Sequence, residues 1–129
     1  MRVLPDTSVW VDYLRGRDPS TVAALDAYLE RESVLVCGPV VAELLAGTTP
    51  LQREDVWLAI GSLPWADLDR AAWREVGEVA NDLRRGGVSV PLTDVVIAVA
   101  TARSDAELWT RDRNFERIRQ TLPTLRLHR

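Results

Sequence analysis

The 129-residue chain lacks several residue types on which common active sites depend. It has one cysteine and one histidine, which excludes an internal disulfide and every zinc site built from cysteine and histidine. All 16 basic residues are arginine, so no mechanism that needs a lysine ammonium can apply. A metal ion bound to this chain would have to be held by oxygen ligands.

The chain also lacks an apolar run long enough to span a bilayer, and no basic segment followed by an apolar one opens it. We therefore expect a cytoplasmic protein without membrane contact. Hydrophobic residues make up 47% and charged residues 27%, which is ordinary for a globular chain. The length fits one domain over residues 1–129.

Charge is distributed unevenly along the chain. The net charge of −3 argues against a general nucleic-acid coat protein. Residues 103–129, however, hold seven arginines against four acids, whereas residues 1–102 hold nine against fifteen. A basic end could bind nucleic acid locally, and a solvated charged face explains the pattern about as well.

Short apolar runs alternate with segments of helical periodicity, which predicts an α/β fold with a parallel sheet covered on both faces. Strands are expected at residues 2–6, 33–37, 63–68, 107–110 and 124–127. Helices are expected at residues 9–15, 18–30, 40–46, 50–60, 69–85 and 114–120, with a further, strongly apolar helix that begins at Thr93 or Asp94.

Four acids stand where the ligand-binding groups of such a sheet are found. Asp6 ends the first strand, Asp94 begins the apolar helix, and Asp112 follows the strand at 107–110. Glu43 is the one charge in an otherwise apolar helix, which we expect to be buried. Like charges gathered at one edge repel each other without a counter-cation, and oxygen ligands favour Mg²⁺ or Mn²⁺.

Each acid also has a simpler interpretation. Asp6 and Asp94 could cap their helices, which is the commoner use of aspartate at such positions. Asp112 could be a turn residue, and Glu43 could pair with an arginine or extend to solvent. Taken together these alternatives weaken, because all four acids would converge on one edge of the sheet.

Four segments in order resemble the PIN-domain ribonuclease toxins of the VapC type. They are Val3–Gly16 (VLPDTSVWVDYLRG), Val41–Gly47 (VAELLAG), Pro91–Ala98 (PLTDVVIA) and Leu108–Phe115 (LWTRDRNF). The resemblance spans essentially the whole chain. It implies a PIN-like three-layer α/β/α sandwich around a central, mostly five-stranded parallel sheet.

The resemblance also implies an activity and a set of site residues. Asp6, Glu43, Asp94 and Asp112 match the four acidic catalytic positions, which bind one or two Mg²⁺ or Mn²⁺ ions. The hydroxyl positions that support them are matched by Thr7 or Ser8 and by Thr110. The implied toxin is an endoribonuclease that cleaves tRNA or rRNA and stops translation. Its implied partners are a VapB-like antitoxin, a second copy in a homodimer, and a higher hetero-oligomer with the antitoxin.

In the expected mechanism, an ion held by Asp6 and Asp94 activates water, and Asp112 lies near the same or a second ion. Glu43 would hold a water molecule or act as a base. Arginines are the only cationic side chains that could bind RNA phosphates, and a solvated charged face is the alternative for each. The candidates are Arg84, Arg85, Arg111, Arg113, Arg117 and Arg119.

The chain departs from the family pattern at two positions. Asn114 stands where many relatives have a further acid, which would weaken a second metal site. Pro5 replaces the usual aliphatic residue before the first aspartate, although proline is disfavoured inside a central strand.

Other kinds of protein fit the sequence less well. Phospho-receiver domains need a lysine near the phosphorylated aspartate, and this chain has no lysine. Haloacid-dehalogenase-type phosphatases need a second aspartate two residues after the first, and here Ser8 occupies that position. The remaining alternative is a PIN-like protein that binds RNA or a partner without cleaving.

Several conspicuous residues have ordinary structural interpretations. We expect Cys37 in the core, His128 exposed or disordered near the end of the chain, and Gly86-Gly87 as a helix stop. Trp10 and Trp73 are expected in the core or at a dimer face.

Overall fold

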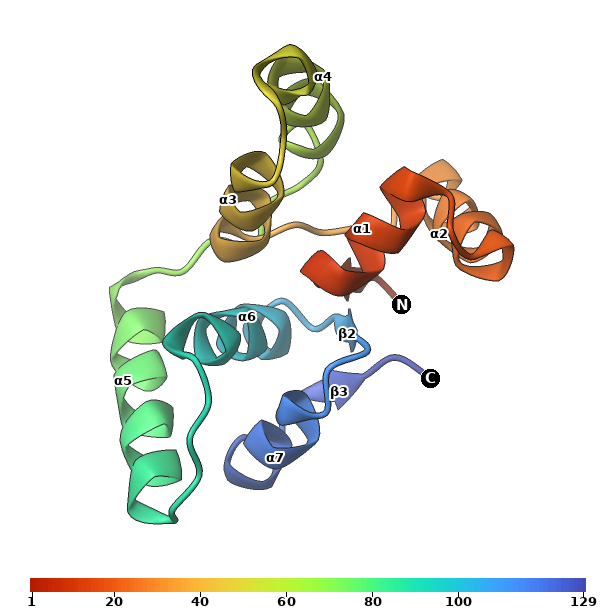
Figure 1. The fold of residues 1–129 in the computed structure, drawn as a ribbon. Helices are drawn as coiled ribbons and strands as arrows, with labels where there is room; N and C mark the ends of the chain where they lie inside the picture. Colours follow the sequence, from red (N-terminus) through yellow and green to blue (C-terminus); the bar gives the residue numbers. More distant parts are fainter.

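A computed structural model describes all residues 1–129 and contains a small parallel sheet with seven helices around it (Figure 1). The sheet consists of β1 (Val3–Pro5), β2 (Glu107–Trp109) and β3 (Arg126–Leu127), in the order β1-β2-β3. Both strand pairs are parallel, as the alternation of strand and helix predicts. The carboxyl ends of the strands therefore meet at one edge.

All the expected helices form, with ends within two residues of those expected. They are α1 (Thr7–Arg15), α2 (Pro19–Glu30), α3 (Gly38–Ala46), α4 (Pro50–Ile60), α5 (Arg70–Arg85), α6 (Leu92–Arg103) and α7 (Asn114–Thr121). Local signals determine several of the ends. Asp69 caps α5 by accepting a hydrogen bond from the backbone N–H of Ala72, and Gly86 ends the same helix.

The predicted strands at 33–37 and 63–68 form only isolated bridges. Val34 bridges to Val3 of β1, and Val36 bridges to Trp65, both in parallel. Two bridged segments and three strands thus occupy five adjacent positions. The five-stranded architecture is confirmed, although only three positions form continuous strands.

Pro5 explains why pairing stops at the first bridge. In parallel pairing, alternate residues of β1 bond to opposite neighbours, and Val3 bonds to the 33–37 segment through both its N–H and its carbonyl oxygen. Pro5 has the same parity as Val3, so its nitrogen faces that segment without a proton to donate. On the opposite side, where Pro5 is in register with Trp109, the ladder needs no donor from it.

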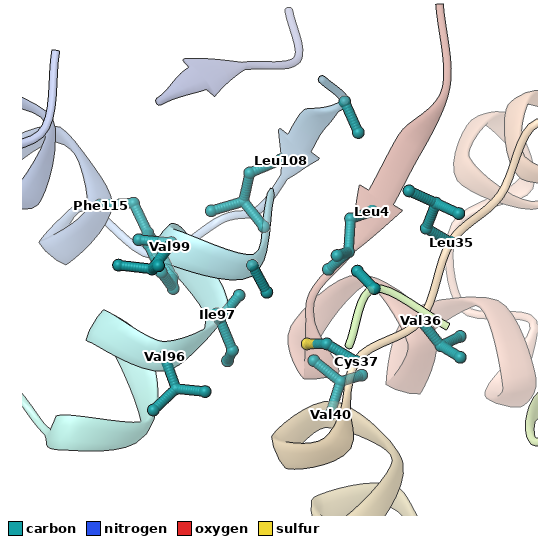
Figure 2. Packing of buried hydrophobic residues seen from close by; sticks show 14 of the residues in the cluster. Leu4, Leu35, Val36, Cys37, Val40, Val96, Ile97, Val99, Leu108 and Phe115 are labelled. Carbon is teal, nitrogen blue, oxygen red and sulfur yellow. The ribbon is translucent and has the colours of Figure 1, made fainter. Parts of the chain in front are cut away.

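The core lies between the strands and the helices that cover them. Figure 2 shows Leu4 of β1, Leu108 of β2, Ile97 of α6 and Val40 of α3 among the side chains gathered there. Residues 95–101 of α6 are all buried, so α6 is the central helix of one layer. In Figure 1, α5, α6 and α7 lie on one side of the strands and α2 lies on the other, which confirms the three-layer arrangement.

The single cysteine and Trp10 are buried, as expected from the sequence. Cys37 is 1% exposed, and burial raises the pKa of its thiol to about 11. Trp10 is fully buried, but Trp73 is 54% exposed and therefore not a core residue. No helix of the fold is both long and apolar enough to cross a membrane.

The expectation for His128 was wrong. Its backbone N–H donates to the carbonyl of Leu108 (2.8 Å), which extends the pairing of β3 with β2 to the last residues of the chain. The ring lies 4.9 Å from the Trp109 ring and 5.5 Å from the Tyr28 ring, centroid to centroid. Its Nδ1 is 3.1 Å from a carboxyl oxygen of Glu107. The histidine is ordered because an edge strand and an aromatic cluster hold it.

Candidate functional site

Asp6 lies at the junction of β1 and α1, and its side chain is almost completely buried. Its Oδ1 accepts hydrogen bonds from the backbone N–H of Val9 (3.2 Å) and from the hydroxyl of Ser8 (2.5 Å). Asp6 is therefore the N-cap of α1, as the simpler interpretation held. Because α1 starts where β1 ends, the capping residue also stands at the carboxyl edge of the sheet.

Thr110 connects Asp6 to the loop that carries Asp112. Its hydroxyl donates to Oδ2 of Asp6 and accepts the backbone N–H of Asp112 (2.9 Å). The Asp112 side chain in turn accepts the backbone N–H of Asn114 (2.9 Å) at the start of α7. Two acids that are far apart in sequence are thus joined through one hydroxyl.

Asp94 lies in the first turn of α6 and does not cap it, since Pro91 occupies the cap position. Its Oδ2 accepts a hydrogen bond from the side-chain amide of Asn114 (3.3 Å). Burial raises the pKa of Asp94; the Asn114 amide opposes this shift, and the charges of Asp112 and Asp6 add to it. Asp94 therefore shares one electrostatic environment with the other two aspartates.

Glu43 reaches this environment from α3. The sequence predicted that this helix is buried on all sides, and that prediction was wrong. Val40, Val41 and Leu44 form its buried face, whereas Glu43 is an exposed residue. The helix is apolar in composition because small and apolar residues also occupy its open side, which a pattern alone does not distinguish from burial. The carboxylate thus needs no buried ion pair.

The pKa of Glu43 is nevertheless raised, first by partial desolvation and then by the charges of Asp94 and Asp6. The Thr7 hydroxyl opposes this shift, although it makes no hydrogen bond of good geometry: Oγ1 of Thr7 is buried without a partner. Buried hydroxyls normally have a hydrogen-bond partner, so the Thr7 hydroxyl is free to bind a further polar group beside Glu43.

The four acids approach one another without forming a closed metal-binding cluster. No three acidic, histidine or cysteine side chains in the chain are arranged so that they could enclose an ion by themselves. The donor set is entirely carboxylate oxygen, which suits a cation that keeps several of its water ligands, as Mg²⁺ does. The residues present therefore fit a hydrated divalent ion better than a tightly enclosed one.

The six candidate arginines fall into different places. Arg111 is held by intramolecular partners, since it donates to Asp12 (2.8 Å) and Thr21 (2.6 Å). Arg113 is exposed in the Asp112 loop, and Arg84 lines a hollow between the end of α5 and the start of α6. The remaining three are exposed: Arg85, Arg117 and Arg119.

The sequence did not reveal how Asn114 and Arg111 are used. Asn114 was noticed only as a departure from an acidic pattern, and its amide proves to hold Asp94. The partners of Arg111 lie 99 and 90 residues away, so no local signal could have identified them.

Known proteins resemble this chain in both sequence and fold. The family model of the PIN domain matches residues 3–120. A VapC ribonuclease from Mycobacterium bovis is 29% identical over 126 residues, with 90% of each chain covered. The structure of VapBC2 from Rickettsia felis bound to a promoter DNA fragment contains a chain with TM-score 0.80 and 22% identity, covering 99% of this chain and 98% of that one. A toxin-antitoxin complex from Klebsiella pneumoniae contains another with TM-score 0.72 and 16% identity, covering 95% and 94%.

Proposed function

The chain belongs to the PIN-domain family, and on that premise we propose that it is a VapC-type toxin, a divalent-metal-dependent endoribonuclease. One observation carries the proposal: acids from β1–α1, α3, α6 and the loop after β2 gather at the carboxyl edge of the sheet. The ribonuclease name of a relative that matches along 90% of the chain agrees with it. We further propose that residues 1–129 form a single PIN domain.

Asp6, Asp94 and Asp112 are the proposed ligands of Mg²⁺ or Mn²⁺. The bound ion would supply a Lewis acid that stabilises charge on the scissile phosphate and promotes attack by water. The hydroxyls of Ser8 and Thr110 hold the Asp6 carboxylate in one orientation, because each donates to a different oxygen. These two hydrogen bonds fix the rotation of the Asp6 carboxylate, which orients it toward the proposed ion.

Glu43 is the proposed proton acceptor. Its raised pKa makes it a better base than an ordinary glutamate, and its exposure leaves it accessible to water. The unpaired Thr7 hydroxyl beside it could donate to the attacking water or to Glu43 itself.

The substrate that this site suits is RNA, cleaved at a phosphodiester. The proposed targets are tRNA or rRNA, whose loss stops translation and growth. Arg113, which follows Asp112 in the same loop, is the proposed phosphate contact beside the acids, and Arg84, in the hollow at the start of α6, is a second one. Arg85, Arg117 and Arg119 would extend the basic surface.

A VapB-like antitoxin is the proposed protein partner. The similar chain from Klebsiella pneumoniae belongs to a toxin-antitoxin complex. A groove of about 400 Å³ lies between α1, α3 and α4, and Val11, Leu14, Leu44 and Glu43 are among the residues that line it. Its apolar side chains and the Glu43 carboxylate suit a peptide that carries both apolar side chains and an arginine. We also propose a homodimer and a higher hetero-oligomer with the antitoxin.

A cleavage assay with purified protein tests the activity. RNA should be cut with Mg²⁺ or Mn²⁺ and left intact with EDTA. Asp94→Asn should abolish cleavage while circular dichroism shows an unchanged fold, because the amide keeps the shape and removes the charge. Asp112→Asn should reduce cleavage less, since Asn114 already weakens a second ion site. Cleavage at full rate in EDTA, or by Asp94→Asn, would disprove the proposed mechanism.

The second candidate is a PIN-like protein that binds RNA or a partner without cleaving it. One observation favours this alternative: the acids do not form a closed metal-binding cluster. RNA binding by the wild type without any cleavage, across both metal ions, would select this alternative.

A further inference from the structure

Arg111 makes contacts that neither the general proposal nor an RNA-binding role explains. It lies in the loop between β2 and α7, immediately before Asp112. Its Nε donates to Oδ2 of Asp12 on α1 (2.8 Å), and its Nη2 donates to the hydroxyl of Thr21 on α2 (2.6 Å). The same Nη2 is 3.6 Å from Asp18. One guanidinium thus connects the Asp112 loop to two helices.

The residues that receive Arg111 are themselves joined by hydrogen bonds. Asp18 caps α2 by accepting the backbone N–H of Ser20 (3.1 Å), and it also accepts the hydroxyl of Thr21 (2.8 Å). Thr21 is buried, 4% exposed. Gly16 ends α1 in the left-handed region (φ 62°), which fixes the turn between the helices. Arg111 therefore binds a preformed corner of the fold.

The position of this corner relates Arg111 to the site. Asp6 caps the start of α1 and is joined to the Asp112 loop through Thr110, and Asp12 lies further along the same helix. Two neighbouring residues of the loop, Thr110 and Arg111, are thus attached to two separate positions on α1. Two points of attachment restrict the motion of the loop more than either one does alone.

We infer that Arg111 is a positioning residue that holds the Asp112 loop against the α1–α2 corner, and that it is not a contact to RNA. The inference rests on the proposed function, in which Asp112 binds the metal ion. Lysine is a poor replacement for this arginine, because its donors all lie on one nitrogen, whereas the planar guanidinium presents Nε to Asp12 and Nη2 to Thr21 in a fixed geometry.

Two variants separate positioning from phosphate binding. If Arg111 positions the loop, Arg111→Ala and Arg111→Lys should both lower kcat by roughly tenfold to a hundredfold, with little change in KM for RNA. Both should also need more Mg²⁺ for half-maximal cleavage. If Arg111 contacts phosphate, Arg111→Lys should keep most of the activity, and Arg111→Ala should raise KM and weaken the dependence of binding on salt. That second result would overturn the inference.

A measurement that does not depend on activity tests the bracing itself. In ¹⁵N relaxation experiments, the backbone amides of Asp112 and Asn114 should lose order in Arg111→Ala and Arg111→Lys. Arg74→Ala is the matched control, because Arg74 is an exposed arginine on α5, away from the site, and makes only an exposed i,i+4 ion pair with Glu78. Unchanged order in both Arg111 variants would refute the inference. If the wild type cleaves no RNA, the proposed function fails, and the relaxation data still decide whether Arg111 braces the loop.

Discussion

The Thr110 hydroxyl offers the sharpest test of how the site is organised. Thr110→Val keeps the shape of the side chain and removes its one oxygen. That oxygen donates to the nearly buried carboxylate of Asp6 and accepts the backbone N–H of Asp112. The substitution therefore tests a single hydrogen-bonding group without opening a cavity.

The two contacts contribute unequally to stability. A hydrogen bond to a charged group contributes about 1.5–3 kcal/mol, and Asp6 loses one of its three donors. The Asp112 amide belongs to an exposed residue, so water can replace the threonine oxygen there at little cost. We expect Thr110→Val to lower the free energy of unfolding by about 2 kcal/mol, which corresponds to a fall in Tm of roughly 5–10 °C for a chain of this size.

Thr110→Ser is the matched control, because it keeps the hydroxyl and removes only a methyl group, at a cost of about 0.5–1 kcal/mol. Urea unfolding in EDTA, with both variants and the wild type at one pH, gives the difference directly. If Thr110→Val is as stable as Thr110→Ser within about 0.5 kcal/mol, Asp6 does not depend on Thr110 and the reasoning fails.

Three further predictions concern charge and packing. Because burial raises the pKa of Asp94, the folded state takes up a proton before the unfolded state as the pH falls, so the Asp94 charge destabilises the fold at neutral pH. In chelator, Asp94→Asn should thus be more stable than wild type at neutral pH and lose this advantage as the pH falls through the raised pKa toward 3.8; an advantage that stays constant with pH contradicts this. Asn114→Asp replaces a donor to Asp94 with a like charge, so it should lower Tm in EDTA and show a larger rise in Tm with Mg²⁺ than wild type does; equal Mg²⁺ shifts would refute it. His128→Ala removes a half-buried ring from contact with Trp109 and Tyr28 and should cost about 1 kcal/mol in thermal unfolding, whereas an unchanged Tm would show that the last residues do not stabilise the sheet.

Features that depend on neighbouring residues in the sequence could be predicted. Asp18 and Asp69 were recognised as helix starts because a cap bonds to amides two or three residues away. The apolar run of α6 correctly indicated a helix, and its residues 95–101 prove to be buried. The order of strands and helices was also predicted, because each element has a hydrophobic pattern within its own segment of the sequence.

Features that depend on distant partners could not be predicted. Glu43 lies on a helix whose composition resembles that of α6, yet the Glu43 side of α3 is exposed. Pairing stops at the isolated bridge of Val34 because Pro5, some thirty positions earlier in the sequence, has no N–H to donate. Asp6, Asp94 and Asp112 were identified because they fall at the ends of predicted elements, and Glu43 because it is the one charge in an apolar helix. The distances between the four acids, however, depend on packing that no sequence pattern records.

Pro5 has a mechanical consequence for the site. Only two backbone hydrogen bonds join the 33–37 segment to β1, from Val3 N–H to Ser33 and from Leu35 N–H to Val3. Glu43 follows that segment on α3, whereas Asp6 belongs to the continuous ladder. The position of Glu43 relative to the aspartates is therefore set by the interlocking of Val40 and Leu44 with the core, not by the backbone network of the sheet. A change of one methylene in that packing would displace the proposed base while leaving the proposed metal ligands in place.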